Sequence, residues 1–310
     1  MILSVIIPVY NSGKYLYRCL ESVFRAVALS KVSTEVVIVD NGSSDNSMEI
    51  VKDFMEKSPL RITVLQCHTK GAAAARNFGI SKVKSKYVWF VDADDTIAEK
   101  SVNLLISEAE SKKADIVMMG ASRIYKGKHS DYLSAVKPTE PNFKSRFVRY
   151  GAGPWQFVFN REWWMRHGFS FAEGMIHEDM EMISALILYT DNFAAVDQPL
   201  YFYYQNSGSV LHKKAWDPHY LDIFPALSGL YTRFEKAKAT SKYHDELEWF
   251  FIWNLLIDSN KDFSSFPEGK VGFKMTREML SHYFPKWRKN RFLREKPLKL
   301  RIRVRMNYYK

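Results

Sequence analysis

Short apolar runs alternate with segments of helical periodicity through residues 1–120. Five runs are compact and rich in β-branched residues, which is typical of buried strands; they span 3–10, 35–40, 61–67, 87–92 and 114–121. Between them, apolar residues recur every three or four positions, which predicts helices at 15–27, 45–57, 72–83 and 97–112. Asp45 suits the N-cap of the second helix. The alternation predicts an α/β fold with a mostly parallel sheet flanked by helices.

The rest of the chain changes character three times. Residues 122–150 are basic and loop-rich without a clear period, and the segment up to 204 is heavily aromatic. After Asp217 the pattern is helical, with one apolar stripe that we interpret as core: Tyr220, Ile223, Phe224, Leu227, Leu230, Tyr231 and Phe234. We therefore expect four parts, namely two halves of one α/β domain, a helical region and a basic tail: 1–121, 122–215, 216–285 and 286–310.

Composition indicates a globular protein of a reducing compartment. Hydrophobic residues make up 46% of the 310 positions, enough for a sizeable core. Two cysteines, Cys19 and Cys67, are too few for a disulfide framework and lack metal-ligand spacing. The apolar N-terminus has no basic leader, and the nine-residue, largely apolar run 249–257 falls short of the roughly 20 residues that a membrane span needs. We expect a soluble, cytoplasmic protein.

The formal net charge of +11 is concentrated at the end of the chain. Positions 286–310 hold 11 of the 45 basic residues but one of the 34 acids, Glu295, so positions 1–285 are almost neutral. From Leu298 to Met306 apolar and basic residues alternate strictly, which favours an amphipathic strand. Such a tail is either a solubilising end or an attachment to an anionic membrane surface, where each basic residue contributes about 1 kcal/mol.

An acidic cluster follows the fourth apolar run. Asp92, Asp94 and Asp95 lie within four positions directly after the buried segment 87–91. One of them, Asp94 or Asp95, could cap a helix that begins near Ile97, but a cap does not account for three. Like charges this close repel each other unless a cation lies among them. A divalent metal that holds a diphosphate is the favoured interpretation.

Other strand ends also carry polar residues. Asp40 ends the second run, where an Asx turn and a hydrogen bond to a nucleotide base are equally good interpretations. Arg76 follows four consecutive alanines on the third predicted helix, where its guanidinium could bind phosphate. The chain has neither a dinucleotide-type glycine pattern nor a GxxxxGK[ST] loop. Because ligands bind beyond the carboxyl ends of parallel strands, these side chains are expected to meet there.

Four segments in this order and spacing resemble family-2 glycosyltransferases with the GT-A fold: "SVIIPVYN", "EVVIVDNGSSDNS", "KGAAAARNFG" and "YVWFVDADD". Farther on, "FAEGMIHEDMEM" is similar to the acidic ED motif of this family, and "PLYFYYQNSGSVLH" to the strand and loop after it. The resemblance is strong over the first 120 residues and weak beyond 215. It implies a mostly parallel GT-A sheet flanked by helices and a helical C-terminal region.

The resemblance also implies roles for individual residues. Four donor-site residues would be Pro8 and Tyr10 against the nucleotide base, Asp40 hydrogen-bonded to it, and Arg76. Asp94 would bind the metal, Mn²⁺ or Mg²⁺, while Asp92 would contact the ribose or the metal through water. Asp179 would be the general base with Glu178 beside it, and His212 is either a further metal or phosphate contact or an ordinary loop residue.

These roles amount to an inverting transfer from a nucleotide sugar, with UDP expected, to a glycan or lipid-linked acceptor in bacterial surface polysaccharide synthesis. The aromatic residues Trp155, Trp163 and Trp164 suit either a sugar-binding cleft or the core. Two alternatives are a sugar nucleotidyltransferase, which lacks its glycine-rich lysine loop here, and a basic nucleic-acid-binding protein. Positions 1–285 are almost neutral, which disfavours a nucleic-acid-binding function, so no nucleic acid is expected as a partner.

Overall fold

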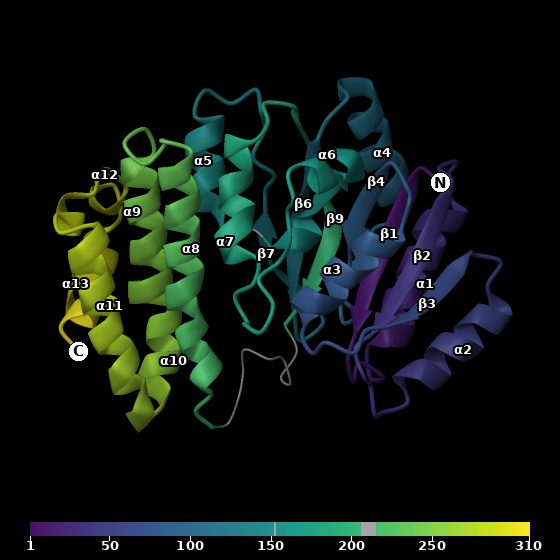
Figure 1. Cartoon of the computed structure of the whole chain (residues 1–310), viewed down its shortest axis with the longest axis horizontal. Helices are drawn as coiled ribbons and strands as arrows, with labels where there is room; N and C mark the ends of the chain where they lie inside the picture. The colour runs from purple at the N-terminus through teal and green to yellow at the C-terminus, as the bar shows by residue number, and fades with distance from the viewer. Residues whose placement is uncertain (152, 206–214) are drawn as a thin grey trace. The chain divides into compact units, whose positions relative to one another are not determined.

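The computed structural model describes residues 1–151, 153–205 and 215–310, and it divides the chain into two compact units. The first comprises Met1–Pro141, Gly153–Gly174 and Thr190–Ser207, and the second Asn142–Ala152, Met175–Tyr189 and Gly208–Lys310. The first unit is α/β and the second helical (Figure 1). Among the described residues, no helix is both long and apolar enough to span a membrane.

The first unit is built on a nine-stranded sheet in the order β3-β2-β1-β4-β8-β6-β9-β5, with β7 paired to β6. The strands are β1 (Leu3–Val9), β2 (Thr34–Asp40), β3 (Ile62–Gln66), β4 (Tyr87–Phe90), β5 (Thr96–Ile97), β6 (Ile116–Tyr125), β7 (Lys128–Leu133), β8 (Phe157–Asn160) and β9 (Phe193–Tyr204). Strands β1 to β4 are all parallel, as are β6 and β9, whereas β5, β7 and β8 pair antiparallel to their neighbours. The predicted parallel sheet is thus confirmed for the first four strands and becomes mixed beyond them.

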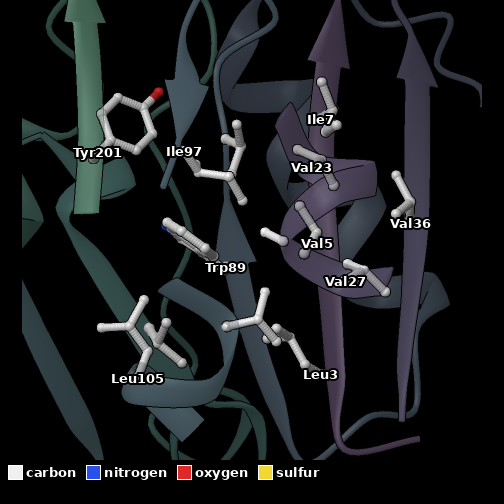
Figure 2. Close-up of a cluster of buried hydrophobic side chains, with 14 of the residues drawn as sticks. Leu3, Val5, Ile7, Val23, Val27, Val36, Trp89, Ile97, Leu105 and Tyr201 are labelled. Atoms are coloured by element: carbon white, nitrogen blue, oxygen red, sulfur yellow. The ribbon is translucent and has the colours of Figure 1, made fainter. Parts of the chain in front are cut away.

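Alternation along the central strands sends side chains to both faces of the sheet. The helices of this unit are α1 (Leu16–Ala28), α2 (Ser47–Lys57), α3 (Ala72–Lys82), α4 (Ser101–Lys112) and α6 (Arg161–Arg166). Every second residue of β1, from Leu3 to Val9, packs with α1 residues such as Val23 and with Leu105 of α4 (Figure 2). Trp89 of β4 and Tyr201 of β9 extend the same cluster. This buried layer fixes the strands whose ends carry the predicted site.

The opposite face of the sheet receives α3, and glycine permits its close approach. A Cβ added to Gly79 would lie 2.6 Å from Cγ2 of Ile6 on β1 and 3.1 Å from Cγ2 of Val39 on β2. Both strand side chains are fully buried, so neither has room to move away. Ala73, Ala74 and Ala75, which precede Gly79 on α3, are buried as well.

The regular elements that the structure describes in the second unit are all helices. It contains α5 (Phe143–Tyr150), α7 (Met180–Ile183), α8 (Ile223–Lys236), α9 (His244–Trp253), α10 (Ser259–Ser265), α11 (Lys270–Tyr283), α12 (Arg291–Arg294) and α13 (Leu298–Tyr308). The apolar stripe predicted after Asp217 is confirmed as core, since Ile223, Leu227, Leu230 and Phe234 on α8 are buried. The apolar positions 249–257 are buried as well, apart from Trp253.

Three expectations about local structure were wrong. Residues 122–150 contain the β6–β7 hairpin and α5, and the hairpin turns at Lys126 and Gly127, whose φ angles of 48° and 75° are those of a two-residue turn. The second helix begins at Ser47, with Asn46 rather than Asp45 at its N-cap. The alternating segment of the tail forms helix α13 and not a strand. A strand there would leave its backbone unpaired, because the described part of the second unit has no other strand.

The close packing of α3 gives a stability prediction. Gly79→Ala should lower the free energy of unfolding by about 1–3 kcal/mol, because overpacking a fixed interface outweighs the better helix propensity of alanine. Denaturant unfolding measures the change, and Lys82→Ala, at an exposed position of the same helix, serves as the control. A variant at least as stable as the parent would show that the helix can move away from Ile6 and Val39.

Candidate active site

Three parallel strands deliver predicted site residues to one edge of the sheet. Val9 at the end of β1 is paired in register with Asp40 at the end of β2, and Asn41 donates its N–H to the carbonyl of Val9 at 2.8 Å. On the other side of β1, the N–H of Val91 donates to the carbonyl of Ile6 at 3.0 Å. Tyr10, Asp40 and the acidic cluster therefore all leave the sheet at its carboxyl edge.

The loop after β1 is locked to the loop after β2. Asn11, with a φ of 47°, accepts from the N–H of Ser44 at 2.8 Å through its side-chain oxygen, and Asp45 accepts from the N–H of Gly13 at 2.8 Å. Tyr10 is 59% exposed between these contacts, and Pro8 is half-buried. The structure leaves the Tyr10 ring accessible, which is what the predicted contact with a base requires.

Asp40 and Asn41 both have structural contacts. The carboxylate of Asp40 is almost fully buried and accepts from the N–H of Ser43 at 3.0 Å, so the turn interpretation holds for one of its oxygens. Asn41 donates to the carbonyl of Thr69 at 2.6 Å and accepts from the N–H of Gly71 at 2.7 Å. Asn41 thereby fixes the loop that leads into α3 and hence the position of Arg76.

Arg76 and the first aspartate of the cluster are brought together. Arg76 is buried, and its Nη2 lies 2.8 Å from Oδ1 of Asp92, whose side chain is 25% exposed. Its guanidinium also lies 5.6 Å from the ring of Phe171. The neighbouring Asn77 holds that segment through the N–H and carbonyl of Phe171, both at 2.9 Å. Arg76 and Asp92, two predicted donor-site residues that are 16 positions apart in the sequence, therefore form an ion pair.

The third aspartate, Asp95, makes contacts that neither interpretation of the acidic cluster predicted. Asp95 is fully buried, and it accepts from the hydroxyl of Tyr201 and from the N–H of Tyr204, both at 2.7 Å. Asp95 therefore connects the acidic loop to β9 and does not cap a helix. Burial, followed by repulsion from Asp92 and Asp94, raises the pKa of Asp95 well above its usual value.

Arg18 on α1 holds the middle of the acidic loop. Its Nη2 donates to the carbonyl oxygen of Asp94 at 2.6 Å, and its guanidinium carbon lies 3.5 Å from the ring centre of Tyr204. Next to it, the Cys19 thiol faces the carbonyl of Asp92 at 3.6 Å, and burial raises the pKa of this thiol well above its usual value. The half-buried Asp94 is thus positioned through its backbone from α1.

The aromatic residues divide between core and site edge. Trp163 and Trp164 are buried, so they belong to the core and not to a sugar-binding cleft. Trp155 is half-buried and stacks on Tyr201 at 4.5 Å and on Tyr203 at 5.6 Å. Since Tyr201 also binds Asp95, this stack reaches the base of the acidic loop.

The predicted base lies in the second unit, where Asp179 is half-buried and precedes α7. Glu181 on the same short helix is an ion-pair partner, with its Oε1 2.8 Å from Nη2 of Arg233 on α8, so this member of the acidic motif is structural. His177 is half-buried, and its partial burial lowers its pKa. Glu178 is half-buried beside Asp179, whereas His212 lies outside the described residues.

The second unit also contains an acidic group that the sequence did not single out. Ligand atoms of His244, Asp245 and Glu248 lie within 4.8 Å of one another. Asp245 is already paired with Nε of Arg291 at 3.0 Å, and Glu248 accepts from Asn290 at 2.8 Å. Because of these contacts, we interpret the three side chains as structural residues that join α9 to α12.

Comparison with known proteins agrees with the geometry of the strand ends. The family described as Glycosyl transferase family 2 matches residues 4–168, which is more than half of the chain. The chain belongs to this family. Glycosyltransferase GlyG of Streptococcus pneumoniae is 29% identical over 72% of this chain and 78% of its own. An uncharacterized glycosyltransferase, YibD of Escherichia coli, is 27% identical over 80% and 76%.

Solved structures support a GT-A fold for this family-2 member. TarS residues 1–349 from S. aureus, crystallised in complex with UDP-GlcNAc, covers 99% of this chain and 89% of its own with a TM-score of 0.75 at 18% identity. The mannosyltransferase PcManGT of Pyrobaculum calidifontis, in complex with GDP-Man and Mn²⁺, reaches a TM-score of 0.54 at 16% identity, with 99% and 86% covered. At these identities the likeness concerns the fold.

Sequence reasoning missed the residues that support the family motifs. Arg18 lies outside the quoted family segments, and Asn77 and Tyr204 lie inside them without an assigned role; their partners are 76, 94 and 109 positions away. Asn41 and Asp95 were visible as neighbours of motif residues, but their partners were not. Only the tertiary fold shows these contacts.

Arg18 gives a prediction for the acidic loop. Arg18→Ala should speed amide hydrogen exchange at residues 94–97 and at Tyr204, because one charge-assisted hydrogen bond and one ring contact are lost. Global stability should fall by only about 1–2 kcal/mol. Exchange measured by mass spectrometry reports both, with Arg25→Ala, a mostly exposed arginine of the same helix, as the control. Equal exchange in the two variants would exclude a positioning function for Arg18.

Proposed function

We propose that this glycosyltransferase moves a sugar, with inversion, from a UDP-sugar to a hydroxyl of a glycan or lipid-linked acceptor, with the help of a divalent metal. One observation carries the proposal: the acidic loop, Asp40 and the accessible Tyr10 ring share the carboxyl edge of the sheet, and Arg76 is paired into that loop. Acceptors of bacterial surface polysaccharide synthesis fit this chemistry.

The residues present fit a metal ion. Asp92 and Asp94 are two positions apart on a loop whose backbone is fixed from α1 and β9, and carboxylate oxygens are the ligands that hard cations take. As the family resemblance implies, we propose the direct metal contact for Asp94 and a ribose or water-mediated contact for Asp92, which Arg76 orients through one oxygen. The metal, Mn²⁺ or Mg²⁺, would neutralise charge that develops on the leaving diphosphate.

The donor is proposed from the same edge and from the neighbours. Tyr10 and Pro8 would pack on the base and Asp40 would bind it, while Arg76 would keep Asp92 oriented toward the donor. We propose UDP as the nucleotide of the donor, and the complex of the structural neighbour TarS 1–349 with UDP-GlcNAc is in line with this proposal.

Asp179 is proposed as the general base. A carboxylate that takes the proton of the attacking acceptor hydroxyl allows a single displacement, which inverts the anomeric centre. Glu181 is unsuited to this function because Arg233 already binds it. The name of a relative that is 30% identical over 116 residues, poly(ribitol-phosphate) β-N-acetylglucosaminyltransferase TarS, likewise describes β-transfer of a sugar to a polymer. A nucleotidyltransferase or nucleic-acid-binding function has no support among these relatives.

Metal dependence is tested at Asp94. Asp94→Ala should abolish metal-supported UDP binding and slow donor turnover at least about 10³-fold, because several kcal/mol of stabilisation of the leaving diphosphate are lost. Calorimetry of UDP binding with and without Mn²⁺ measures the first effect, and excess chelator should reproduce it in the parent protein. Asp53→Ala, an acid exposed on α2, is the matched control. Full activity in chelator would refute the proposal.

The base is tested separately. Asp179→Asn keeps the shape of the side chain but removes its basicity, so turnover should fall by about 10²–10⁴-fold while UDP affinity is unchanged. Glu178→Gln is the matched control and should retain most activity. If Asp179→Asn turns over normally and Glu178→Gln does not, the base is Glu178 instead.

A further inference from the structure

Helix α13 exposes a stripe of large apolar side chains. Leu298 is 64% exposed, Ile302 48%, Met306 64% and Tyr309, directly after the helix, 72%. Spacings of four, four and three residues place all four on one helical face. Large apolar side chains gathered in this way on a surface mark a contact site.

The opposite face anchors the helix in the second unit. Val304 is fully buried, and Asn307 is buried and donates to the carbonyl of Leu256 at 2.7 Å. The ring of Tyr308 lies 5.2 Å from that of the buried Trp287. The apolar stripe is therefore held outward by the packing of the helix.

Basic residues border the stripe on both sides. At about 100° per residue, Arg305 lies next to Leu298 on one side, and Lys299 and Arg303 lie next to Met306 on the other. All three are exposed, and no acidic residue occurs from 296 to 310. The exposed face thus combines apolar side chains, which acyl chains accept, with basic groups, which anionic headgroups attract.

We propose that α13 docks on an anionic lipid surface, with its apolar stripe among the acyl chains and its basic residues at the headgroups. The helix is 11 residues long, about 16 Å, so it would lie on the bilayer and not cross it. A second copy of the chain is a poorer occupant, because a self-complementary contact would bring the same basic residues together. The proposal concerns binding alone, so it can fail or hold independently of the proposed catalysis.

The first test separates charge at this helix from charge elsewhere. Arg303→Gln with Arg305→Gln should weaken binding to vesicles of phosphatidylcholine and phosphatidylglycerol about thirtyfold, since each basic residue contributes a factor of about five. Lys52→Gln with Lys84→Gln removes the same charge from exposed positions of the first unit and should have little effect. Equal losses in both double variants would mean nonspecific attraction and would overturn the proposal.

The second test asks whether the stripe enters the lipid. Both native cysteines are buried, so Met306→Cys can be labelled selectively with a polarity-sensitive fluorophore. Its emission should shift to the blue with the anionic vesicles, and less with phosphatidylcholine alone. Leu29→Cys, at a 62% exposed position of the first unit, should show no shift. Absence of a shift at position 306 would overturn the proposal.

A third variant distinguishes lipid from protein. Ile302→Ser with Met306→Ser should weaken vesicle binding about tenfold or more, because apolar groups that entered the bilayer are lost. Sedimentation without vesicles should give the same mass for parent and variant. A parent dimer that the variant converts to monomers would assign the stripe to a second copy and overturn lipid docking.

Discussion

The hydrogen bonds of one buried carboxylate determine how the acidic loop is held. Asp95 has no exposed surface, and a buried charge is costly unless its oxygens are satisfied. One oxygen accepts from the hydroxyl of Tyr201 and the other from the N–H of Tyr204. The same hydroxyl accepts from the N–H of Asp92 at 3.1 Å. A single phenol thus ties both ends of the Asp92–Asp95 turn to β9, and the stack of Trp155 on Tyr201 supports it.

This arrangement leaves the other two aspartates with separate tasks. Asp92 is oriented by Arg76, which is buried and comes from α3. Asp94 is positioned through its carbonyl by Arg18, which comes from α1. The close approach of α3 at Gly79 and the packing of α1 on the other face therefore determine where each carboxylate lies. The loop is fixed by its surroundings, and preorganised ligands bind with less loss of conformational entropy.

The sequence predicted what depends on local pattern and missed what depends on distant partners. Buried strands at the N-terminus were predicted from apolar runs, and the polar residues at their ends made Asp40, Asp92 and Asp94 candidate site residues. The distinct function of Asp95 could not be predicted, because its partners follow by more than a hundred positions. Arg18 could not be singled out either, because its partner Asp94 lies 76 positions away. How Asp179 serves the acceptor, and the linear division into four parts, stay predictions from sequence.

The tail shows why a period alone can mislead. Strict alternation gives two faces on a strand, but on a helix the same residues at even positions separate into a buried group and an exposed group. Val304 falls on the buried side, whereas Leu298, Ile302 and Met306 fall together on the exposed side. Arginine and leucine are good helix formers, so propensity favoured the helix over the strand that the period suggested. The prediction of a strand was wrong, but the segment contains the same basic and apolar side chains in either conformation. In the helix the exposed apolar residues and the basic residues lie side by side on one continuous surface. In a strand they would lie on opposite faces.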